Sequence, residues 1–244
     1  MKVLITGAKG FLGKNFIKKL KEKGQLYSIY EYDVDNTLED LDYYCQNADA
    51  IFHFAAVQRP KTGESYRNNI SLTERILSIL DQHNNKCPII FSSSIQAELD
   101  NEYGVSKKSE EQLLLSYGKK TGAHIFVFRF PNMFGTMSKP NYTSVVSTFC
   151  YNISHNLPVT INNPTSVIKL AYVNDVIDYV LSRFENDNGF GGIEYYPFYV
   201  SINLAELLYC ITSLKINEKC EIAKLENEFV KKIESVYNWL SEIE

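Results

Sequence analysis

The sequence contains no run of apolar residues that approaches the roughly 18 needed to cross a bilayer. Its first charged residue is Lys2, and the apolar run after it is only three residues long, so we expect no signal peptide. Basic residues number 25 against 29 acidic ones, a balance that excludes a general basic surface for nucleic acid or an anionic membrane. We therefore predict a cytoplasmic protein.

Cysteine and histidine are few and scattered. The five cysteines form no Cys-x-x-Cys pair and are odd in number, which argues against a disulfide framework or a zinc ribbon and indicates free thiols in a reducing compartment. The four histidines, at 53, 83, 124 and 155, lack metal-ligand spacing, so no metal is predicted. Ser92–Ser94 lies outside any Gly-x-Ser-x-Gly pattern, which excludes a hydrolase nucleophile elbow.

Short apolar segments alternate with helical patterns over the first 130 residues. Expected strands are Lys2–Thr6, Tyr27–Tyr32, Ala50–Ala55, Ile89–Ser92 and Ile125–Phe130, and expected helices span 11–23, 38–47, 68–83 and 104–121. Strands that alternate with helices predict a parallel sheet covered by helices on both faces. The fold class is therefore α/β, a doubly wound parallel Rossmann sheet of six or seven strands.

The regular alternation of strands and helices ends after Pro131, where further prolines divide the chain into shorter segments. We expect helices at 145–156, 175–184, 203–214 and 224–242, and short strands at 159–161, 167–170 and 199–202. This pattern predicts a Rossmann core over residues 1–135 and a small C-terminal substrate lobe. The lobe would take up most of residues 136–244, with some elements returning to the core.

A glycine-rich loop, Gly7-Ala-Lys-Gly10-Phe-Leu-Gly13, lies between the first strand and the first helix. Glycine at these positions permits a tight turn, approach of the backbone to a pyrophosphate, and close packing of helix on strand. The helix N-terminus that follows favours an anion. We predict that Gly7, Lys9, Gly10, Phe11, Leu12 and Gly13 bind a dinucleotide; a purely structural glycine turn is the alternative.

Two charges near this loop favour different cofactors. Asp33 lies 20 residues after Gly13, which suits the two ribose hydroxyls of NAD. The ammonium of Lys9 could instead face the 2′-phosphate of NADP. Either residue could also be a solvated rim charge, so the choice between NAD(H) and NADP(H) stays open.

A catalytic pattern follows the fourth strand. Tyr103 and Lys107 are four residues apart and share one face of a helix, so the lysine charge should favour the phenolate and bring the tyrosine pKa nearer neutrality. Ser94 ends the preceding strand, where its hydroxyl could hydrogen-bond a substrate carbonyl. Tyr-x-x-x-Lys alone is a weak signal; it gains weight from the serine run and the glycine loop.

Together these segments resemble the extended short-chain dehydrogenase/reductase family. The elements that carry the resemblance are Thr6-Gly-x-x-Gly-x-x-Gly13, His53-Phe-Ala-Ala56, Asn69, Ser92–Ser94, Tyr103-x-x-x-Lys107, Arg129–Gly135 and Tyr172–Asp175. The resemblance implies that Tyr103 donates a proton, that Lys107 holds the nicotinamide ribose and lowers the tyrosine pKa, and that Ser94 orients the reacting oxygen. Ala55 and Ala56 would lie along the cofactor and Asn69 would support the active-site helices.

A narrower likeness is to the reductase domain of capsular-polysaccharide enzymes that form UDP-N-acetyl-L-fucosamine precursors. It is carried by Gln58–Lys61, Ser92–Ala97, Phe130–Gly135, Lys139–Tyr142 and Thr148–Tyr151. It implies NADPH-dependent reduction of the C4 ketone of a UDP-2-acetamido-2,6-dideoxy-hexulose. This likeness and Lys9 together favour NADPH slightly over NADH. Candidate substrate contacts are Arg59, Ser94, Asn132, Lys139 and Tyr142. The alternatives are a solvated loop for Arg59 and a surface turn for Lys139–Tyr142.

The sequence departs from that likeness at two points. It ends at Glu244 in a helical pattern, so a C-terminal cupin is not expected in this chain, and Asp33 stands where NADPH would favour a basic or neutral residue. Dehydration is not expected, because Ile95 and Gln96 replace the Asp-Glu pair of related dehydratases. A nucleotide-sugar 4-epimerase with retained NAD and a non-catalytic dinucleotide-binding sensor or scaffold remain alternatives.

We also expect a homodimer through the helices at 68–83 and 104–121, which would pack as a four-helix bundle across a two-fold axis. Its apolar seam would come from Ile76, Ile79 and Leu80, or from Leu113–Leu115.

Overall fold

The computed structural model describes residues 1–62, 65–186, 191–216, 218, 220, 222 and 225–243. The chain divides into two compact units. The first comprises Met1–Phe130 and Ile177–Tyr196, and the second comprises Pro131–Val176 and Pro197–Glu244. The chain thus leaves the first unit five residues before the predicted boundary at 135 and returns to it for one later segment.

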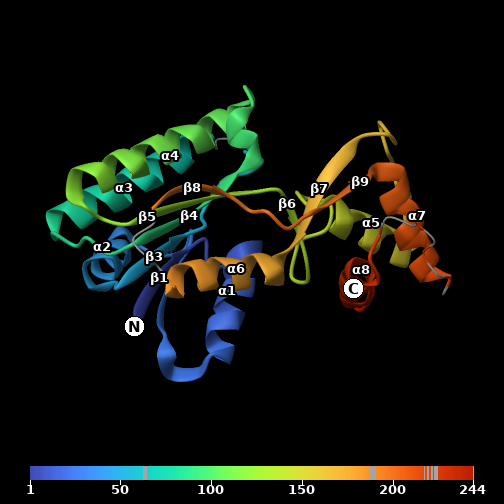
Figure 1. Cartoon of the computed structure of the whole chain (residues 1–244), viewed down its shortest axis with the longest axis horizontal. Helices are drawn as coiled ribbons and strands as arrows, with labels where there is room; N and C mark the ends of the chain where they lie inside the picture. Colours follow the sequence, from blue (N-terminus) through green and yellow to red (C-terminus); the bar gives the residue numbers. More distant parts are fainter. Residues whose placement is uncertain are drawn as a thin grey trace. The chain divides into compact units, whose positions relative to one another are not determined.

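A six-stranded parallel sheet forms the centre of the first unit (Figure 1). Its strands are β1 (Lys2–Thr6), β2 (Ser28–Tyr32), β3 (Ala50–His53), β4 (Ile89–Ser94), β5 (Ile125–Phe130) and β8 (Gly192–Tyr195), in the order β2-β1-β3-β4-β5-β8. This order confirms the predicted α/β Rossmann-like class. Strand β8 was not predicted, because it is a half-exposed edge strand whose apolar residues do not form a run.

Helices cover both faces of this sheet. They are α1 (Phe11–Glu22), α2 (Leu38–Asn47), α3 (Arg67–Gln82), α4 (Glu102–Thr121) and α6 (Val173–Glu185), with 3-10 turns η1 (Gly24–Leu26) and η2 (Ile95–Glu98). Helices α2, α3 and α4 share one core with the strands. On the other face, Phe52 of β3 packs against Phe16 of α1 and Phe184 of α6. Figure 1 shows α3 and α4 on one side of the sheet and α1 and α6 on the other.

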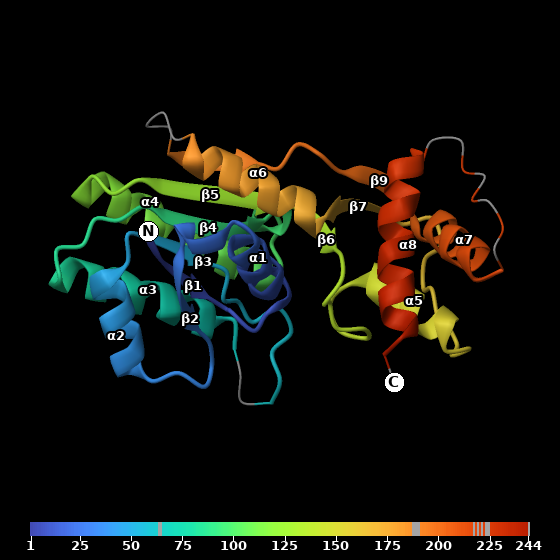
Figure 2. The same ribbon diagram turned by 90° about the horizontal axis from the view of Figure 1, so that it is seen from below.

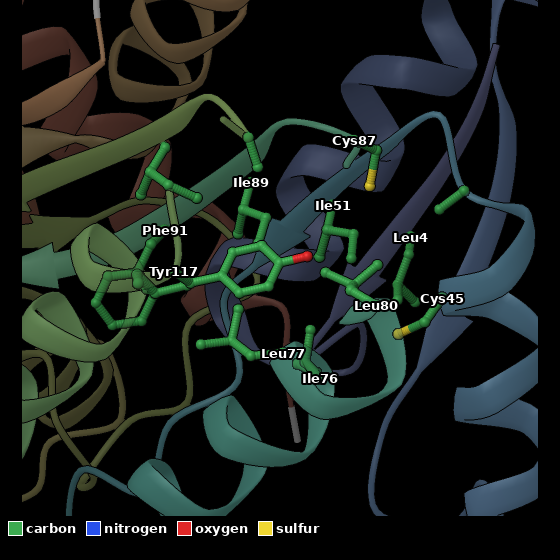
Figure 3. Packing of buried hydrophobic residues seen from close by; sticks show 14 of the residues in the cluster. Leu4, Cys45, Ile51, Ile76, Leu77, Leu80, Cys87, Ile89, Phe91 and Tyr117 are labelled. Carbon is green, nitrogen blue, oxygen red and sulfur yellow. The ribbon is translucent and has the colours of Figure 1, made fainter. Parts of the chain in front are cut away.

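The core beneath α2, α3 and α4 explains why these segments are helical. An apolar stripe runs along α3, where Ile76, Leu77 and Leu80 lie on one face of the helix. These side chains are buried against Ile51 and Ile89 of the strands (Figure 3). Such burial along one stripe is what stabilises an amphipathic helix on a sheet.

The same burial corrects the expected dimer seam. Ile76, Leu80 and Leu114 are buried in the core of their own protomer, so they offer no surface to a partner. Only Ile79, Leu113 and Leu115 of that set remain partly exposed. Helices α3 and α4 do lie side by side, as Figures 1 and 2 show; the dimer itself stays a prediction.

The second unit has its own sheet and core. Strands β6 (Asn132–Phe134), β7 (Val167–Tyr172) and β9 (Val200–Asn203) form a sheet in the order β6-β7-β9, with β6 parallel and β9 antiparallel to β7. Helices α5 (Val145–Ser154), α7 (Leu204–Lys215) and α8 (Asn227–Ser241) pack together over a separate apolar cluster. The predicted helix at 224–242 begins at Asn227, and residue 224 lies outside the described residues.

One predicted strand of this unit is wrong. Residues 159–161 are irregular, and the side chains of Val159 and Ile161 pack against the apolar cluster of the helices. Pro158 and Pro164 flank the segment and lack the N–H groups that a sheet ladder requires. The apolar pattern therefore reflects packing against helices and not membership of a sheet.

No helix among the described residues is long and apolar enough to cross a membrane. The described part of the chain brings together no group of three or more His, Cys, Asp or Glu residues that could hold a metal ion. All five cysteines are free thiols.

We predict that Leu80→Ala destabilises the protein strongly. The side chain is fully buried, and truncation of a buried leucine costs about 2–5 kcal/mol of unfolding free energy. Urea unfolding measures the loss. Ser78→Ala, on the exposed face of the same helix, is the control and should change stability by about 0.5 kcal/mol or less. Equal effects of the two changes would contradict the assignment of Leu80 to the core.

Candidate functional site

The glycine loop joins β1 to α1 by a turn that requires glycine. Gly7 has a φ of +69°, and a Cβ atom on Gly13 would lie 2.2 Å from the carbonyl oxygen of Gly7. The N-cap residue of α1 is Gly10, which offers no side-chain acceptor, and the first turn carries no acidic residue. The start of α1 therefore presents backbone N–H groups and a positive dipole end to an anion. This arrangement fits the pyrophosphate of a dinucleotide.

Asp33 lies directly beside this loop, immediately after β2. Its Oδ2 accepts a hydrogen bond from the backbone N–H of Lys9 at 2.7 Å. The Lys9 ammonium turns to Asp35, with Nζ 2.6 Å from Oδ2, and this hydrogen bond raises the pKa of Lys9 and lowers the pKa of Asp35. The positive charge that could have faced a 2′-phosphate is thus paired with a carboxylate.

The ends of β1 and β3 are joined to helices α3 and α4 by buried polar groups. His53 of β3 lies between two threonines, with Nδ1 2.7 Å from Thr6 Oγ1 and Nε2 2.9 Å from Thr73 Oγ1. Burial lowers the pKa of His53 to about 3, so the ring is neutral and serves as a hydrogen-bonding link. The backbone N–H of Ala55 donates to Thr6 Oγ1 at 3.2 Å, which positions the loop that contains Ala55 and Ala56.

Asn69 connects that loop to both helices. The N–H of Val57 donates to Asn69 Oδ1 at 2.7 Å, and Asn69 Nδ2 donates to the carbonyl of Val57 at 3.1 Å. Asn69 Nδ2 also lies 3.5 Å from Ser106 Oγ, which donates to the carbonyl of Tyr103 at 2.8 Å. A supporting role for Asn69 is consistent with these bonds, since they tie α3 to the turn of α4 that carries the tyrosine.

The connection between β4 and α4 follows Ser94, the last residue of β4, and leads to Tyr103 in the first turn of α4. Ser94 Oγ accepts the N–H of Gln96 at 3.1 Å and so begins η2, and the Asn101 side chain caps α4 by accepting the N–H of Gly104 at 2.8 Å. A Cβ atom on Gly104 would lie 2.1 Å from the carbonyl oxygen of Gln96. Glycine is therefore required for the first turn of α4 to rest on η2. Gly104 was not among the expected site residues; the signal that could have found it was a glycine inside the first helical turn.

Tyr103 is partly buried, and its ring centroid lies 5.9 Å from that of Tyr66. Burial is the main cause that raises the pKa of Tyr103, and the charges of Glu110 and Tyr66 raise it further. We expected Lys107 to lower this pKa. Within the chain's own residues the shift has the opposite sign, because burial penalises the phenolate and Glu110 repels it.

Lys107 is almost fully buried, with 1% of its side chain exposed. Its Nζ lies 3.3 Å from Oε2 of Glu110 and 4.4 Å from the centroid of the Phe91 ring. Neither Nζ nor Glu110 Oε2 makes a hydrogen bond to any described residue. A buried ammonium that lacks hydrogen bonds is costly, and its three donors fit the hydroxyls of a ribose.

A second buried ion pair was not anticipated from the sequence. Arg129 of β5 binds Glu111 of α4 through two bonds, Nε to Oε1 at 2.9 Å and Nη2 to Oε2 at 2.6 Å. Ser93 Oγ donates to Glu111 Oε1 at 2.5 Å, and Arg129 Nη1 also contacts Glu98 and Tyr195. A charged residue within the apolar run of β5 was the signal that could have suggested this pair.

The expected substrate residues are divided between the units. Arg59 is exposed in the loop after β3 of the first unit. Asn132, Lys139 and Tyr142 belong to the second unit; all three are exposed, and Asn132 Nδ2 donates to the carbonyl of Lys169 at 3.3 Å. The grouping of these four residues around one substrate stays a prediction.

The parallel sheet and the glycine loop define a protein of the Rossmann-like class, and comparison with known proteins agrees with that class. Residues 3–195 match the NAD dependent epimerase/dehydratase family. The chain belongs to this family.

Two similar proteins have a more specific description than the family. The chain is 40% identical over 178 residues to a UDP-2-acetamido-2,6-beta-L-arabino-hexul-4-ose reductase of Pseudomonas aeruginosa, a match that spans 72% of this chain and 48% of the reductase. The structure of this chain is similar to that of the capsular polysaccharide assembling protein CapF of Staphylococcus aureus. The TM-score is 0.84 and the identity is 33%, over 98% of this chain and 65% of CapF. The chain thus spans about half the length of the first relative and under two thirds of the second.

A more distant structure supports the fold alone. The UDP-glucose 4-epimerase of Thermus thermophilus, solved in complex with NAD, has a TM-score of 0.82 and 17% identity, with full coverage of both chains.

We predict that Gly104→Ala destabilises the protein, because the added methyl group would overlap the carbonyl of Gln96. Such overpacking costs about 1–3 kcal/mol, which lowers the Tm by roughly 2–12 °C in a chain of this size. Differential scanning calorimetry measures the shift. Ser116→Ala, at an exposed position of the same helix, should leave the Tm within about 2 °C; a Gly104→Ala variant as stable as this control would show that the two elements are not in close contact.

Proposed function

We propose that this chain reduces the 4-keto group of a UDP-linked 2-acetamido-2,6-dideoxy-hexulose with a reduced nicotinamide dinucleotide, in the synthesis of surface-polysaccharide precursors. The observation that carries the proposal is the 40% identity to the Pseudomonas reductase, in a chain whose α4 presents Tyr103 and Lys107. The likeness to CapF supports the assignment to capsular polysaccharide synthesis. A cytoplasmic location, suited to five free thiols, is part of the proposal.

The dinucleotide would be held by residues of the first unit. Gly7, Gly10 and Gly13 would admit the pyrophosphate against the start of α1, Asp33 would accept hydrogen bonds from the adenine ribose, and Lys107 would donate to the nicotinamide ribose. The bound cofactor would supply hydride to the ketone carbon. The remaining predicted cofactor contacts are Lys9, Phe11, Leu12, Ala55, Ala56, Asn69 and Tyr103.

Tyr103 would donate the proton that the reduced oxygen requires, and Ser94 would hydrogen-bond that oxygen. Both interactions strengthen as negative charge develops on the oxygen, which is the condition for lowering the barrier. The raised pKa of Tyr103 keeps its proton in place at neutral pH. That state suits an acid in a reduction better than the base with which an epimerase begins.

The substrate would be bound by Arg59, Asn132, Lys139 and Tyr142, with cationic side chains toward the diphosphate. Ile95 and Gln96 follow Ser94 in η2, so no acid-base pair stands beside Tyr103 there to eliminate water. This composition favours simple reduction of the ketone.

NADH is the cofactor that the loop favours. Glu31, Asp33 and Asp35 all raise the pKa of Lys9, and these carboxylates would repel a 2′-phosphate. The narrower likeness and Lys9 both favoured NADPH slightly in the sequence; the pairing of Lys9 with Asp35 weakens the support that came from Lys9.

Replacement of the catalytic tyrosine tests the chemistry. Tyr103→Phe should reduce kcat by about 10²–10⁴-fold, the contribution of a positioned general acid, while the affinity for NADH stays within about threefold. Loss of nicotinamide absorbance with a panel of UDP- and dTDP-4-keto sugars measures turnover, and cofactor fluorescence measures binding. Tyr43→Phe, at an exposed position of α2, is a matched control for loss of one phenol. Interconversion of UDP-hexoses without added cofactor would favour the epimerase, and dinucleotide binding without either activity would favour a sensor.

Replacement of the ribose carboxylate tests cofactor choice. Asp33→Asn should weaken NADH binding and strengthen NADPH binding, so that the ratio of the two Kd values changes by about tenfold or more in favour of NADPH, as loss of one close like charge predicts. Titration of both reduced cofactors measures the ratio. Glu39→Gln, which removes an exposed acid of α2, is the control. An unchanged ratio in Asp33→Asn would show that Asp33 does not face the ribose.

A further inference from the structure

Helix α4 carries a buried acid that the proposed chemistry does not use. Glu110 lies one turn after Lys107 and has no exposed side-chain surface. Its Oε1 accepts a hydrogen bond from Thr73 Oγ1 at 3.0 Å, whereas Oε2 is directed to the Lys107 ammonium at 3.3 Å without a hydrogen bond. Burial raises the pKa of Glu110, and the Lys107 charge opposes this rise, so the ionised carboxylate depends on that cation.

Other charged or titratable groups around this pair do not compete for Lys107. On α4 itself, the neighbouring Glu111 is turned away and is bound by Arg129 of β5. From β3, His53 Nε2 approaches Glu110 Oε1 at 3.9 Å, but the ring is neutral because burial lowers its pKa to about 3. From β4, the aromatic face of Phe91 covers the ammonium.

The segment before α3 adds one further titratable group, Tyr66, whose ring packs beside that of Tyr103. Tyr66 and Glu110 both oppose ionisation of Tyr103. The net charge of the Lys107–Glu110 pair is zero, so the lysine by itself cannot stabilise a phenolate as a lone cation would. How strongly Lys107 acts on Tyr103 therefore depends on how much of its charge Glu110 cancels.

We propose that Glu110 is a positioning residue of this site: its buried carboxylate holds the Lys107 ammonium in place and limits the charge that reaches Tyr103. The proposal rests on the proposed function, in which Tyr103 and Lys107 form the reducing centre. Glu110 touches neither substrate nor cofactor in it. It keeps Lys107 charged in a buried place and keeps Tyr103 protonated, which is the form that a reduction consumes.

The pH dependence of reduction tests this role. Rate falls at high pH as Tyr103 loses its proton, and Glu110→Gln removes a negative charge that opposes this loss. The basic limb of the pH profile of kcat, where the rate falls as pH rises, should therefore move to lower pH by roughly 1–3 units. Glu110→Asp retains the charge and should restore the limb to within about 0.5 unit of the original. Glu74→Gln, which neutralises an exposed acid of the neighbouring helix α3, is the control and should leave the limb in place.

A limb that does not move in Glu110→Gln, or that moves equally in all three variants, would overturn the proposal. A merely structural role for Glu110 would lower the Tm and the yield of active protein without displacing the pH profile, so the two roles are separable in one set of proteins.

A thermal double-mutant cycle tests the pair without any substrate. Lys107→Met leaves Glu110 buried and unpaired and should lower the Tm by roughly 5–15 °C. Addition of Glu110→Gln to this variant should recover part of the loss, because the buried charge disappears. Simple addition of the two single losses would show that the side chains are not coupled, and would overturn the proposal. If the unmodified protein reduces no keto sugar, the proposed function fails, while this cycle still decides the pairing.

Discussion

The bidentate pair between Arg129 and Glu111 is the interaction on which the arrangement of the first unit depends. It joins β5 to the inner face of α4, and Ser93 of β4 and Glu98 of η2 bind the same two side chains. Two buried ions are tolerated because each is neutralised and hydrogen-bonded on several sides. Removal of either partner would leave the other charge buried. The pair thus fixes the position of α4 relative to the carboxyl ends of the strands, and with it the positions of Tyr103 and Lys107.

The strand ends form the second constraint. Parallel pairing places Thr6 opposite His53 and His53 opposite Phe91, so the residues that follow β1, β3 and β4 emerge at one edge of the sheet. Polar groups at this edge cannot be left buried without partners. The side chain of His53 is hydrogen-bonded to Thr6 on one side and to Thr73 on the other. This chain of hydrogen bonds links β1, which precedes the glycine loop, to α3.

The second unit is held by different means. Its helices pack on an apolar cluster of their own, and Lys232 of α8 joins Asp175 and Glu228 at 2.7 Å each. The Tyr172-Val-Asn-Asp175 segment, which contributed to the family resemblance, therefore makes an ion pair inside this unit. The Asp175 carboxylate positions α8 beside the start of α6, and we assign it no catalytic step.

Local patterns in the sequence were sufficient for much of this protein. Short apolar runs located five strands, and period-3.6 hydrophobicity located the four helices between them, because both signals are carried by residues close together in the chain. The glycine loop and the Tyr103–Lys107 spacing were also readable, since both depend on backbone geometry within two turns. Strand β8 and the irregular course of residues 159–161 were not, because each depends on what lies beside the segment in space.

The tertiary structure alone decided the electrostatics of the site. Glu110, Glu111 and Lys107 occupy adjacent turns of one helix, and nothing in their spacing says which acid faces Arg129 and which faces the lysine. The outcome set the sign of the Tyr103 pKa shift, which burial and Glu110 raise where spacing alone had suggested a fall. The sequence by itself determined the fold class and which side chains could react. Their charge states required the packing, because desolvation and pairing depend on neighbours distant in the chain.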